Sequence, residues 1–310
     1  MEALFHNCLE VQQRGGWYFP TRFTKSQYHY FLLEERFRTR MVSTAGACLR
    51  FVTDAAGISF QYRVGSMLER RTGIDLFENG EPRSFWDIGD ENLSGTFTYR
   101  RETAGQAEFE VWLPALCTLE ISGFEVGEWR AVPQAQRSLL ALGDSITQGV
   151  YAARPSRVYP VQLARRMGLG LINQAISGYV FDAEWLEKLE INPALILVAY
   201  GTNDIKRMGE EQPICHNADR FFDRLRTLWP ETDLYYLSPL WRADFTPERQ
   251  RQFEQICRSL EAVAGQYRAT VVSGLSLLPH STDWMRDGYL HPNDYGYDLM
   301  AKGLGEIFCP

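Results

Sequence analysis

Several familiar sequence signals are missing from this chain of 310 residues. It contains no run of about 18 apolar residues, so no membrane-spanning helix is expected. Its N-terminus has no basic segment followed by an apolar run, so no secretory signal is expected either. The net charge is −7 and no basic face is visible, which argues against a nucleic-acid partner. We therefore expect a cytoplasmic protein that binds neither a membrane nor a nucleic acid.

Metal-binding and redox motifs are missing as well. The six cysteines are scattered, with no C-x-x-C pair and no metal-ligand spacing to any of the five histidines. We expect buried or half-buried free thiols, no metal and no cofactor. Apolar residues make up 45% of the chain. That is enough to build a full core in each of the two domains that the length favours.

The first part of the chain, up to about residue 130, has the pattern of short strands. Apolar and polar residues alternate, as in ISFQYRV at 58–64, which is the period of a half-buried strand. Turn-forming segments such as NGEP at 79–82 separate the strands. Many short strands with frequent turns predict a β-sandwich, similar to a jelly roll, over residues 1–133. The expected strands are 47–53, 58–64, 73–77, 96–100, 108–112 and 118–121.

The pattern changes near Pro133, where apolar runs begin to alternate with amphipathic helical segments. Strands that are apolar on both faces belong in a parallel sheet covered by helices. Residues 134–310 are therefore predicted to form an α/β domain. Its expected strands are 138–142, 169–174, 194–200, 233–237 and 269–272, and its expected helices are 159–167, 217–229, 247–267 and 295–308.

Ser145 follows the first predicted strand of this domain, in the segment GDSITQG at 143–149. Open α/β sheets bind ligands at the carboxyl ends of their strands. A serine at a strand-to-helix turn exposes its hydroxyl and leaves its own N–H free, which suits a nucleophile. A helix N-cap is the alternative role for such a serine. The segment is not a G-x-S-x-G elbow, because Thr147 stands where that motif has its second glycine.

Three further polar segments stand at comparable places. Gly178 follows the second strand and could lend its N–H to an oxyanion, or be a plain turn glycine. Asn203 follows the third strand, where its amide would be an oxyanion donor or would close an Asx turn. Asp204 is expected to brace that loop. His291 lies in a glycine-containing loop before the last helix, and its occurrence with the other three segments favours a catalytic base.

These four segments, in this order, resemble the conserved blocks of the SGNH hydrolase superfamily, also called GDSL esterases. The match covers roughly residues 138–300. The resemblance implies a flavodoxin-like, three-layer α/β/α fold and hydrolysis without a metal. It also implies Ser145 as nucleophile, His291 as base, and an oxyanion hole formed by the N–H groups of Ser145 and Gly178 and the amide of Asn203. A sandwich ahead of such a domain is similar to some two-domain carbohydrate acetylesterases.

The chain departs from the family pattern at the third catalytic residue. The pattern places an aspartate three residues before the histidine, but Gly288 stands there and Asp287 is four before. A loop longer by one residue could still bring Asp287 to the imidazole, and this is the favoured interpretation. A Ser–His dyad oriented by a backbone carbonyl is the rival, and Asp283 is a third candidate. Asp294 is interpreted as a cap of the last helix.

Aromatic residues flank the predicted site and suggest the substrate. Among them Tyr179, Trp241 and Trp284 are predicted to bind it, because sugar rings stack well on aromatic faces, although core packing is the commoner role. No long apolar lid segment is present. We therefore expect small acyl groups, above all acetyl, on a carbohydrate or another polar alcohol. A lipase-like or thioesterase activity and an inactive carbohydrate-binding protein are the alternatives.

Overall fold

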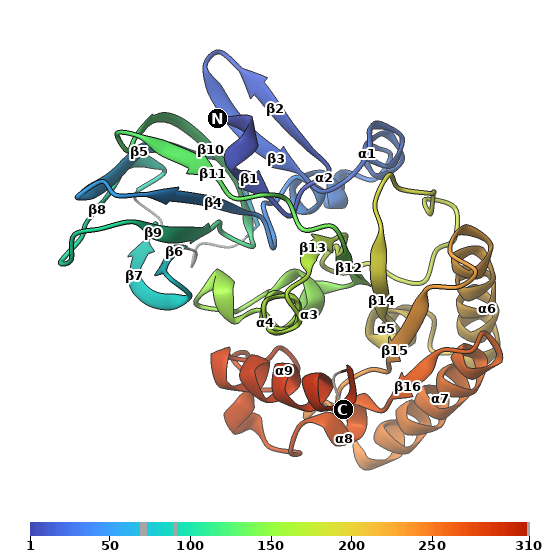
Figure 1. Cartoon of the computed structure of the whole chain (residues 1–310). Coiled ribbons are helices and arrows are strands. Elements are labelled where there is room, and N and C mark those ends of the chain that lie inside the picture. Colours follow the sequence, from blue (N-terminus) through green and yellow to red (C-terminus); the bar gives the residue numbers. More distant parts are fainter. Residues whose placement is uncertain (69–72, 90–91, 309–310) are drawn as a thin grey trace.

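The computed structural model describes residues 1–68, 73–89 and 92–308. The N-terminal part consists mainly of antiparallel sheets, and the C-terminal part is an α/β unit around one parallel sheet, which confirms the predicted fold class (Figure 1). The parallel sheet begins directly after the boundary predicted near Pro133. Five cysteines are free, namely Cys8, Cys48, Cys117, Cys215 and Cys257. Cys309 lies outside the described residues.

Two antiparallel sheets form the N-terminal part. One has the order β1-β4-β9-β6-β7, with β11 on β4, and the other has the order β2-β3-β10-β5-β8. The strands are β1 (Phe5–His6), β2 (Glu10–Arg14), β3 (Trp17–Thr21), β4 (Cys48–Thr53), β5 (Gly57–Met67), β6 (Gly73–Glu78), β7 (Glu81–Asp87), β8 (Ser94–Arg100), β9 (Ala107–Trp112), β10 (Cys117–Glu125) and β11 (Trp129–Ala131).

The alternation seen in the sequence decides which side of each strand is buried. In β5, Ile58, Phe60 and Tyr62 are buried, whereas the residues between them are more exposed. One core cluster takes in these residues together with Phe51 and Phe109 of the other sheet, so the two sheets pack as a sandwich. The predicted turn at 79–82 joins β6 to β7, and Asn79 and Gly80 both have the positive φ that a type I′ hairpin requires.

Two helices interrupt the sandwich, and the sequence analysis did not predict them. They are α1 (Lys25–Leu32) and α2 (Glu35–Met41). Thr24 caps α1 with a capping box: its hydroxyl accepts from the Gln27 N–H, and the Gln27 side chain accepts from the Thr24 N–H. Both helices are short, and each buries only two residues, so their apolar periodicity is weak.

The parallel sheet has the strand order β13-β12-β14-β15-β16, which is the flavodoxin-like order. Its strands match the prediction to within about two residues at each end. They are β12 (Ser138–Gly143), β13 (Gly170–Asn173), β14 (Pro193–Ala199), β15 (Asp233–Leu237) and β16 (Thr270–Val272). β12 is the first strand of this sheet in the sequence and lies between β13 and β14. Its carboxyl end is therefore flanked by the carboxyl ends of these two strands.

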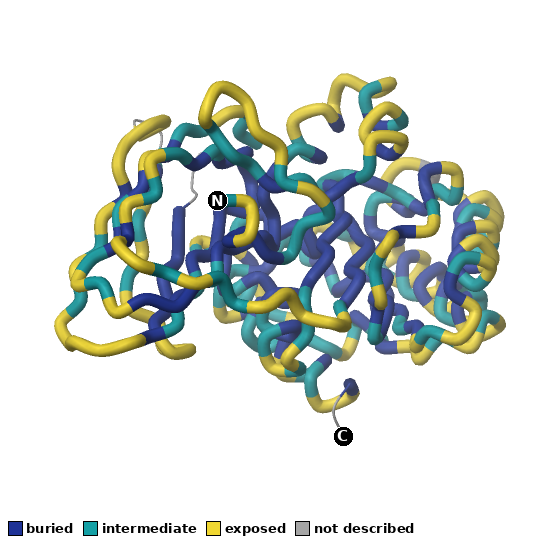
Figure 2. Tube along the Cα trace, turned by 45° about the horizontal axis from the view of Figure 1, so that its top comes forward, coloured by how far each residue is buried: buried dark blue, intermediate teal, exposed yellow. Residues whose placement is uncertain are grey.

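Helices cover both faces of this sheet, which makes the predicted three layers. Leu140 and Leu142 of β12 pack into the cluster that holds α6 (Glu211–Leu228) and α7 (Pro247–Gln266). Leu139 and Ala141 pack into the cluster that holds α4 (Tyr159–Met167) and α9 (Asp294–Phe308). Buried segments gather in the interior, and exposed segments form the outer loops and helix faces (Figure 2). The helices are α3 (Ser145–Gln148), α4 (Tyr159–Met167), α5 (Thr202–Met208), α6 (Glu211–Leu228), α7 (Pro247–Gln266), α8 (Gly274–Leu277) and α9 (Asp294–Phe308), with short 3-10 turns at Glu2–Leu4, Pro155–Arg157 and Thr282–Trp284. Over the described ranges, no helix is both long and apolar enough to cross a membrane.

Candidate active site

Ser145 is held at the sharp turn between β12 and α3. Asp144 caps this short helix, and its Oδ1 accepts a hydrogen bond from the Ile146 N–H at 3.1 Å. Gly143 has no room for a side chain, because a Cβ there would collide with the Thr147 hydroxyl. The Ser145 N–H lies in the first turn of the helix, where no intrahelical acceptor exists. Its hydroxyl and its N–H are thus presented at one edge of the sheet.

The structure brings Ser145, His291 and Asp287 together in one chain of hydrogen bonds. Ser145 Oγ lies 2.8 Å from His291 Nε2, and His291 Nδ1 lies 2.6 Å from Asp287 Oδ2. In the neutral imidazole, an Nδ1–H donated to the carboxylate leaves Nε2 free to accept the serine proton. Asp283, the third candidate, instead accepts a hydrogen bond from Ser281, and Asp294 accepts one from the Ala153 N–H.

The second oxygen of Asp287 explains how a loop longer by one residue reaches the histidine. Oδ1 accepts hydrogen bonds from the N–H groups of Tyr289, Leu290 and His291 at 2.9–3.1 Å. Gly288 has φ +80°, a left-handed conformation that favours glycine, and it lets the chain fold back over the carboxylate. Burial alone would raise the pKa of Asp287, but the hydrogen bonds from His291 and the three N–H groups outweigh it and lower that pKa.

Gly178 occupies a tight turn beside the serine loop. The Tyr179 N–H donates to Ile176 O at 3.0 Å, and Gly178 has φ +76°, as a type II turn requires at that position. The turn is fixed by Gln148, whose Oε1 accepts the Ser177 N–H at 2.6 Å. Within the described residues, the Gly178 N–H has no protein acceptor, so it is available to a ligand.

Asn203 lies in the first turn of α5, and its amide already has protein partners. Nδ2 donates to Asp144 Oδ2 and to Tyr179 O, each at 3.1 Å. Burial raises the pKa of Asp144 to about 6, although the Ile146 N–H and His291 partly offset it. Asp204 accepts from the Phe181 N–H at 3.0 Å and thereby braces this loop, and burial raises its pKa to about 7.

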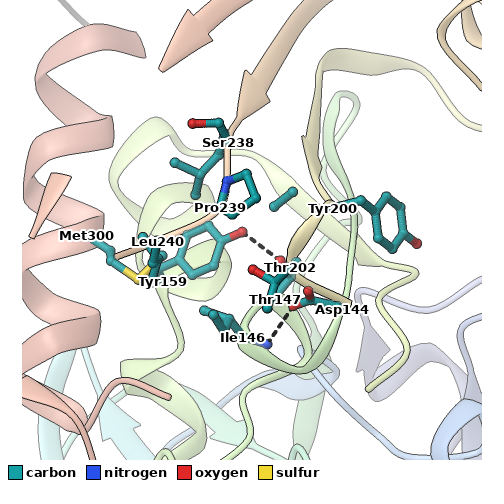
Figure 3. Close-up of a pocket in the computed structure, with 12 residues that line it drawn as sticks. Asp144, Ile146, Thr147, Tyr159, Tyr200, Thr202, Ser238, Pro239, Leu240 and Met300 are labelled. Atoms are coloured by element: carbon teal, nitrogen blue, oxygen red, sulfur yellow. Dashed lines mark hydrogen bonds between the residues drawn. The ribbon is translucent and has the colours of Figure 1, made fainter. Parts of the chain in front are cut away.

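A small cavity lies beneath the serine turn (Figure 3). Its volume is about 20 Å³, which is enough for one water molecule. Asp144, Ile146 and Thr147 border it on the side of the serine, and the Thr147 hydroxyl is 2.8 Å from that of Tyr159.

The three aromatic residues predicted to bind substrate lie in different surroundings. Tyr179 is buried at 4% exposure between Phe37 and Trp185, and its hydroxyl donates to Asp182, so core packing accounts for its position. Trp241 is half-buried and stacks on His280. Trp284 is half-buried and borders a cavity of about 500 Å³. Tyr151 contacts the His291 imidazole itself, edge to face at 5.3 Å between the ring centroids.

Side chains that the sequence analysis missed hold the Gly178 turn from the N-terminal part. The Arg22 guanidinium is fully buried and donates to Asn173 O and Ala175 O on one side and to Ser43 O on the other. Arg40 donates to Ser177 O. The capping box before α1 is a sequence signal for this helical segment, but no local motif marks either arginine.

Similarity to solved structures extends over the whole chain. A protein described as a GDSL-like lipase from Bacteroides ovatus is 19% identical, with a TM-score of 0.80 over 99% of this chain and 96% of that one. A salicylyl-acyltransferase from a tetracycline biosynthetic pathway is 20% identical, with a TM-score of 0.79 over 97% and 92%. An acetyl xylan esterase from Butyrivibrio proteoclasticus is 15% identical, with a TM-score of 0.60 over 96% of both chains. At these identities the likeness shows a shared two-part fold.

Comparison with curated protein sequences gives no match. The sequence model of the GDSL-like lipase/acylhydrolase family, in contrast, matches residues 141–299, just over half of the chain. The matched segment contains Ser145, Gly178, Asn203, Asp287 and His291. The chain belongs to the GDSL-like lipase/acylhydrolase family.

Proposed function

We propose that this protein is a serine esterase that removes small acyl groups, above all acetyl, from a saccharide or a related polar alcohol. The observation that carries the proposal is the hydrogen-bonded series Ser145–His291–Asp287, with distances of 2.8 and 2.6 Å. Family membership supports an acylhydrolase. The acetyl xylan esterase among the structural neighbours supports a small acyl group and a saccharide as the alcohol.

The proposed reaction is acyl transfer in two steps. His291 Nε2 takes the proton of Ser145 while Oγ attacks the ester carbonyl, and the same proton then passes to the leaving alcohol. The resulting acyl-enzyme is hydrolysed by a water molecule that gives its proton to Nε2, and Nε2 returns this proton to Ser145 Oγ as the acid leaves. Asp287 holds the imidazole in the tautomer with hydrogen on Nδ1. The N–H groups of Ser145 and Gly178 and the amide of Asn203 stabilise the tetrahedral oxyanion.

The oxyanion role of Asn203 involves competition between acceptors. Both amide hydrogens already point at Asp144 Oδ2 and Tyr179 O. An oxyanion must therefore share one of these hydrogens or displace its present acceptor. Among the residues that the structure describes, the N–H groups of Ser145 and Gly178 have no competing acceptor, so they are the principal donors in this proposal.

The test is release of acetate from acetylated xylan, acetylated cello-oligosaccharides and p-nitrophenyl acetate, with p-nitrophenyl butyrate and octanoate as a chain-length series. Ser145→Ala should lose about 10^6 in kcat by analogy with other serine hydrolases. Ser276→Ala is the matched control, because it removes the hydroxyl of an exposed serine in α8 that has no role in the proposed mechanism. This variant should keep full activity. Near-normal turnover by Ser145→Ala would refute the mechanism.

The substrate panel separates the alternatives. Preference for octanoate would replace the proposal with a lipase-like or thioesterase activity. Saccharide binding without turnover would indicate an inactive binding protein. That interpretation depended on the shifted aspartate, and the contact of Asp287 with His291 now speaks against it.

A further inference from the structure

Arg40 of α2 lies directly behind the turn that carries Gly178. Its Nη1 donates to Ser177 O at 2.6 Å, and a Cβ on Gly178 would lie 2.5 Å from the same nitrogen. Arg207, from the helix that carries Asn203, donates to the next carbonyl, that of Gly178. Two guanidinium groups thus contact consecutive carbonyls of one turn, and one of them comes from the N-terminal part of the chain.

The contact matters because Ser177 C=O and Gly178 N–H belong to the same peptide group. In a trans peptide these two bonds point in opposite directions within one plane. A cation that binds the carbonyl oxygen draws electron density from the whole amide and makes its N–H a stronger donor. Since Arg40 is on the carbonyl side, the strengthened Gly178 N–H points away from it, and that N–H has no protein acceptor within the described residues.

The backbone of Arg40 is fixed to the catalytic part by two side chains. Gln148, three residues after the serine, donates to Arg40 O at 2.8 Å and accepts the Ser177 N–H through its other amide atom. Arg22 also donates to Arg40 O, at 3.2 Å. The backbone of Arg40 is therefore tied to the helix after the serine and to the buried Arg22, and its guanidinium binds the turn through Ser177 O. Such an arrangement fixes its position relative to the Gly178 peptide.

The charge of Arg40 is not used in an ion pair. Among the described residues no carboxylate forms a salt bridge with it, and burial, together with the like charges of Arg36 and Arg207, lowers the pKa of Arg40. A side chain that served only to join the N-terminal part to the Gly178 turn would need a hydrogen-bond donor for Ser177 O but no positive charge. An unneutralised cation behind an oxyanion donor fits a role in stabilising negative charge.

We propose that Arg40 is a positioning residue of the oxyanion hole, which acts through the Ser177–Gly178 peptide to hold and strengthen the Gly178 N–H toward the tetrahedral intermediate. The inference rests on the proposed esterase function. It gives the N-terminal part a role in catalysis besides any contact with substrate.

The experiment compares Arg40→Met and Arg40→Lys with the control variant Arg38→Met. Arg38 is an exposed arginine on the same helix, and its guanidinium donates to Leu32 O. With p-nitrophenyl acetate as substrate, Arg40→Met should lower kcat at least about tenfold. The decrease should be smaller than the factor of about 10^2–10^3 expected when an oxyanion donor is lost outright, because the Gly178 N–H is still present. KM should stay within about twofold. Arg40→Lys should recover part of the loss, because it keeps a positive charge, and Arg38→Met should match the wild type.

Rescue separates charge from packing. Millimolar guanidinium chloride should restore turnover to Arg40→Ala, whereas sodium chloride at equal ionic strength should not. Thermal unfolding verifies that each variant is folded. Wild-type kcat in folded Arg40→Met, or a rise in KM alone, would overturn the proposal.

Phosphorylation of Ser145 by diethyl p-nitrophenyl phosphate gives a readout independent of the ester substrate, because negative charge also develops on oxygen in that reaction. We expect Arg40→Met to slow it by about the same factor as kcat. A wild type that is neither acylated nor phosphorylated at Ser145 would overturn the esterase function, and this inference with it. Equal phosphorylation and hydrolysis rates in wild type and Arg40→Met would overturn the role of Arg40 alone.

Discussion

Asp287→Asn separates the two tasks that the Asp287 carboxylate performs. Oδ1 accepts three backbone N–H groups and shapes the loop, whereas Oδ2 accepts from His291 Nδ1. An asparagine whose oxygen stays on the three N–H groups turns its NH2 toward Nδ1. That NH2 is a donor, so it selects the imidazole tautomer with hydrogen on Nε2, which cannot accept the serine proton.

The expected loss in kcat is about 10^4, or about 5.4 kcal/mol of transition-state stabilisation, by analogy with triad aspartates elsewhere. The loop should persist, because all three hydrogen bonds to Oδ1 are retained. The thermal midpoint of Asp287→Asn is therefore expected within a few degrees of the wild type. Initial rates with p-nitrophenyl acetate, together with thermal unfolding monitored by circular dichroism, measure the two effects separately.

Asp287→Ala is the companion variant, because it removes both tasks. It should lose a similar factor in kcat and should also unfold at a lower temperature than Asp287→Asn. The reasoning is refuted if Asp287→Asn loses less than about tenfold. Such a result would mean that a backbone carbonyl or water orients His291 and that the 2.6 Å contact has no catalytic role.

Further expectations concern the oxyanion donors and acid stability. Gly178→Ala should destabilise the fold by about 1–2 kcal/mol in urea unfolding, since φ is +76° and the new Cβ would lie 2.5 Å from Arg40 Nη1. Asn203→Ala should lower kcat by about 10^2–10^3 with little change in KM. An unchanged kcat would mean that the backbone N–H groups alone stabilise the oxyanion. The pKa of Asp287 is lower in the folded state than in the unfolded chain, so its stabilising contribution is present above pH of about 4 and is lost as the pH falls further. Between about pH 6 and 3, the thermal midpoint of the wild type should therefore fall more steeply than that of Asp287→Asn.

The parallel sheet was predictable because its strands are apolar on both faces, a pattern that few other structures share. In β14, the five residues from 194 to 198 are all apolar. The strands that the analysis missed carry no such signal. β2 has four exposed residues out of five, and β7 is exposed or half-buried throughout. Because such strands are held by backbone hydrogen bonds to a neighbour, their side chains need no alternation, and the sequence gives no period to detect.

The convergence of the candidate site residues was predictable for a topological reason. Ser145, Gly178 and Asn203 follow β12, β13 and β14, and the carboxyl ends of adjacent parallel strands meet at one edge of a sheet. The place of Asp287 was harder to predict, because the extra residue in its loop is absorbed by the left-handed Gly288, a backbone property that spacing alone does not reveal. Arg40 was out of reach, since its contact with Ser177 O spans 137 positions and follows no motif.

The boundary near residue 133 separates two kinds of sheet, but apolar side chains from the N-terminal part also enter a core cluster of the α/β part. Phe31 and Phe37 of the N-terminal helices are both 1% exposed and pack on Tyr179, the residue after the predicted oxyanion glycine. Removing residues 1–133 would uncover this aromatic cluster and leave the carbonyls of Asn173 and Ala175 without Arg22. Each such buried acceptor costs about 1–3 kcal/mol when it loses its donor. The Gly178 turn is therefore built jointly by both parts of the chain, and its geometry depends on helices that lie outside the matched family segment.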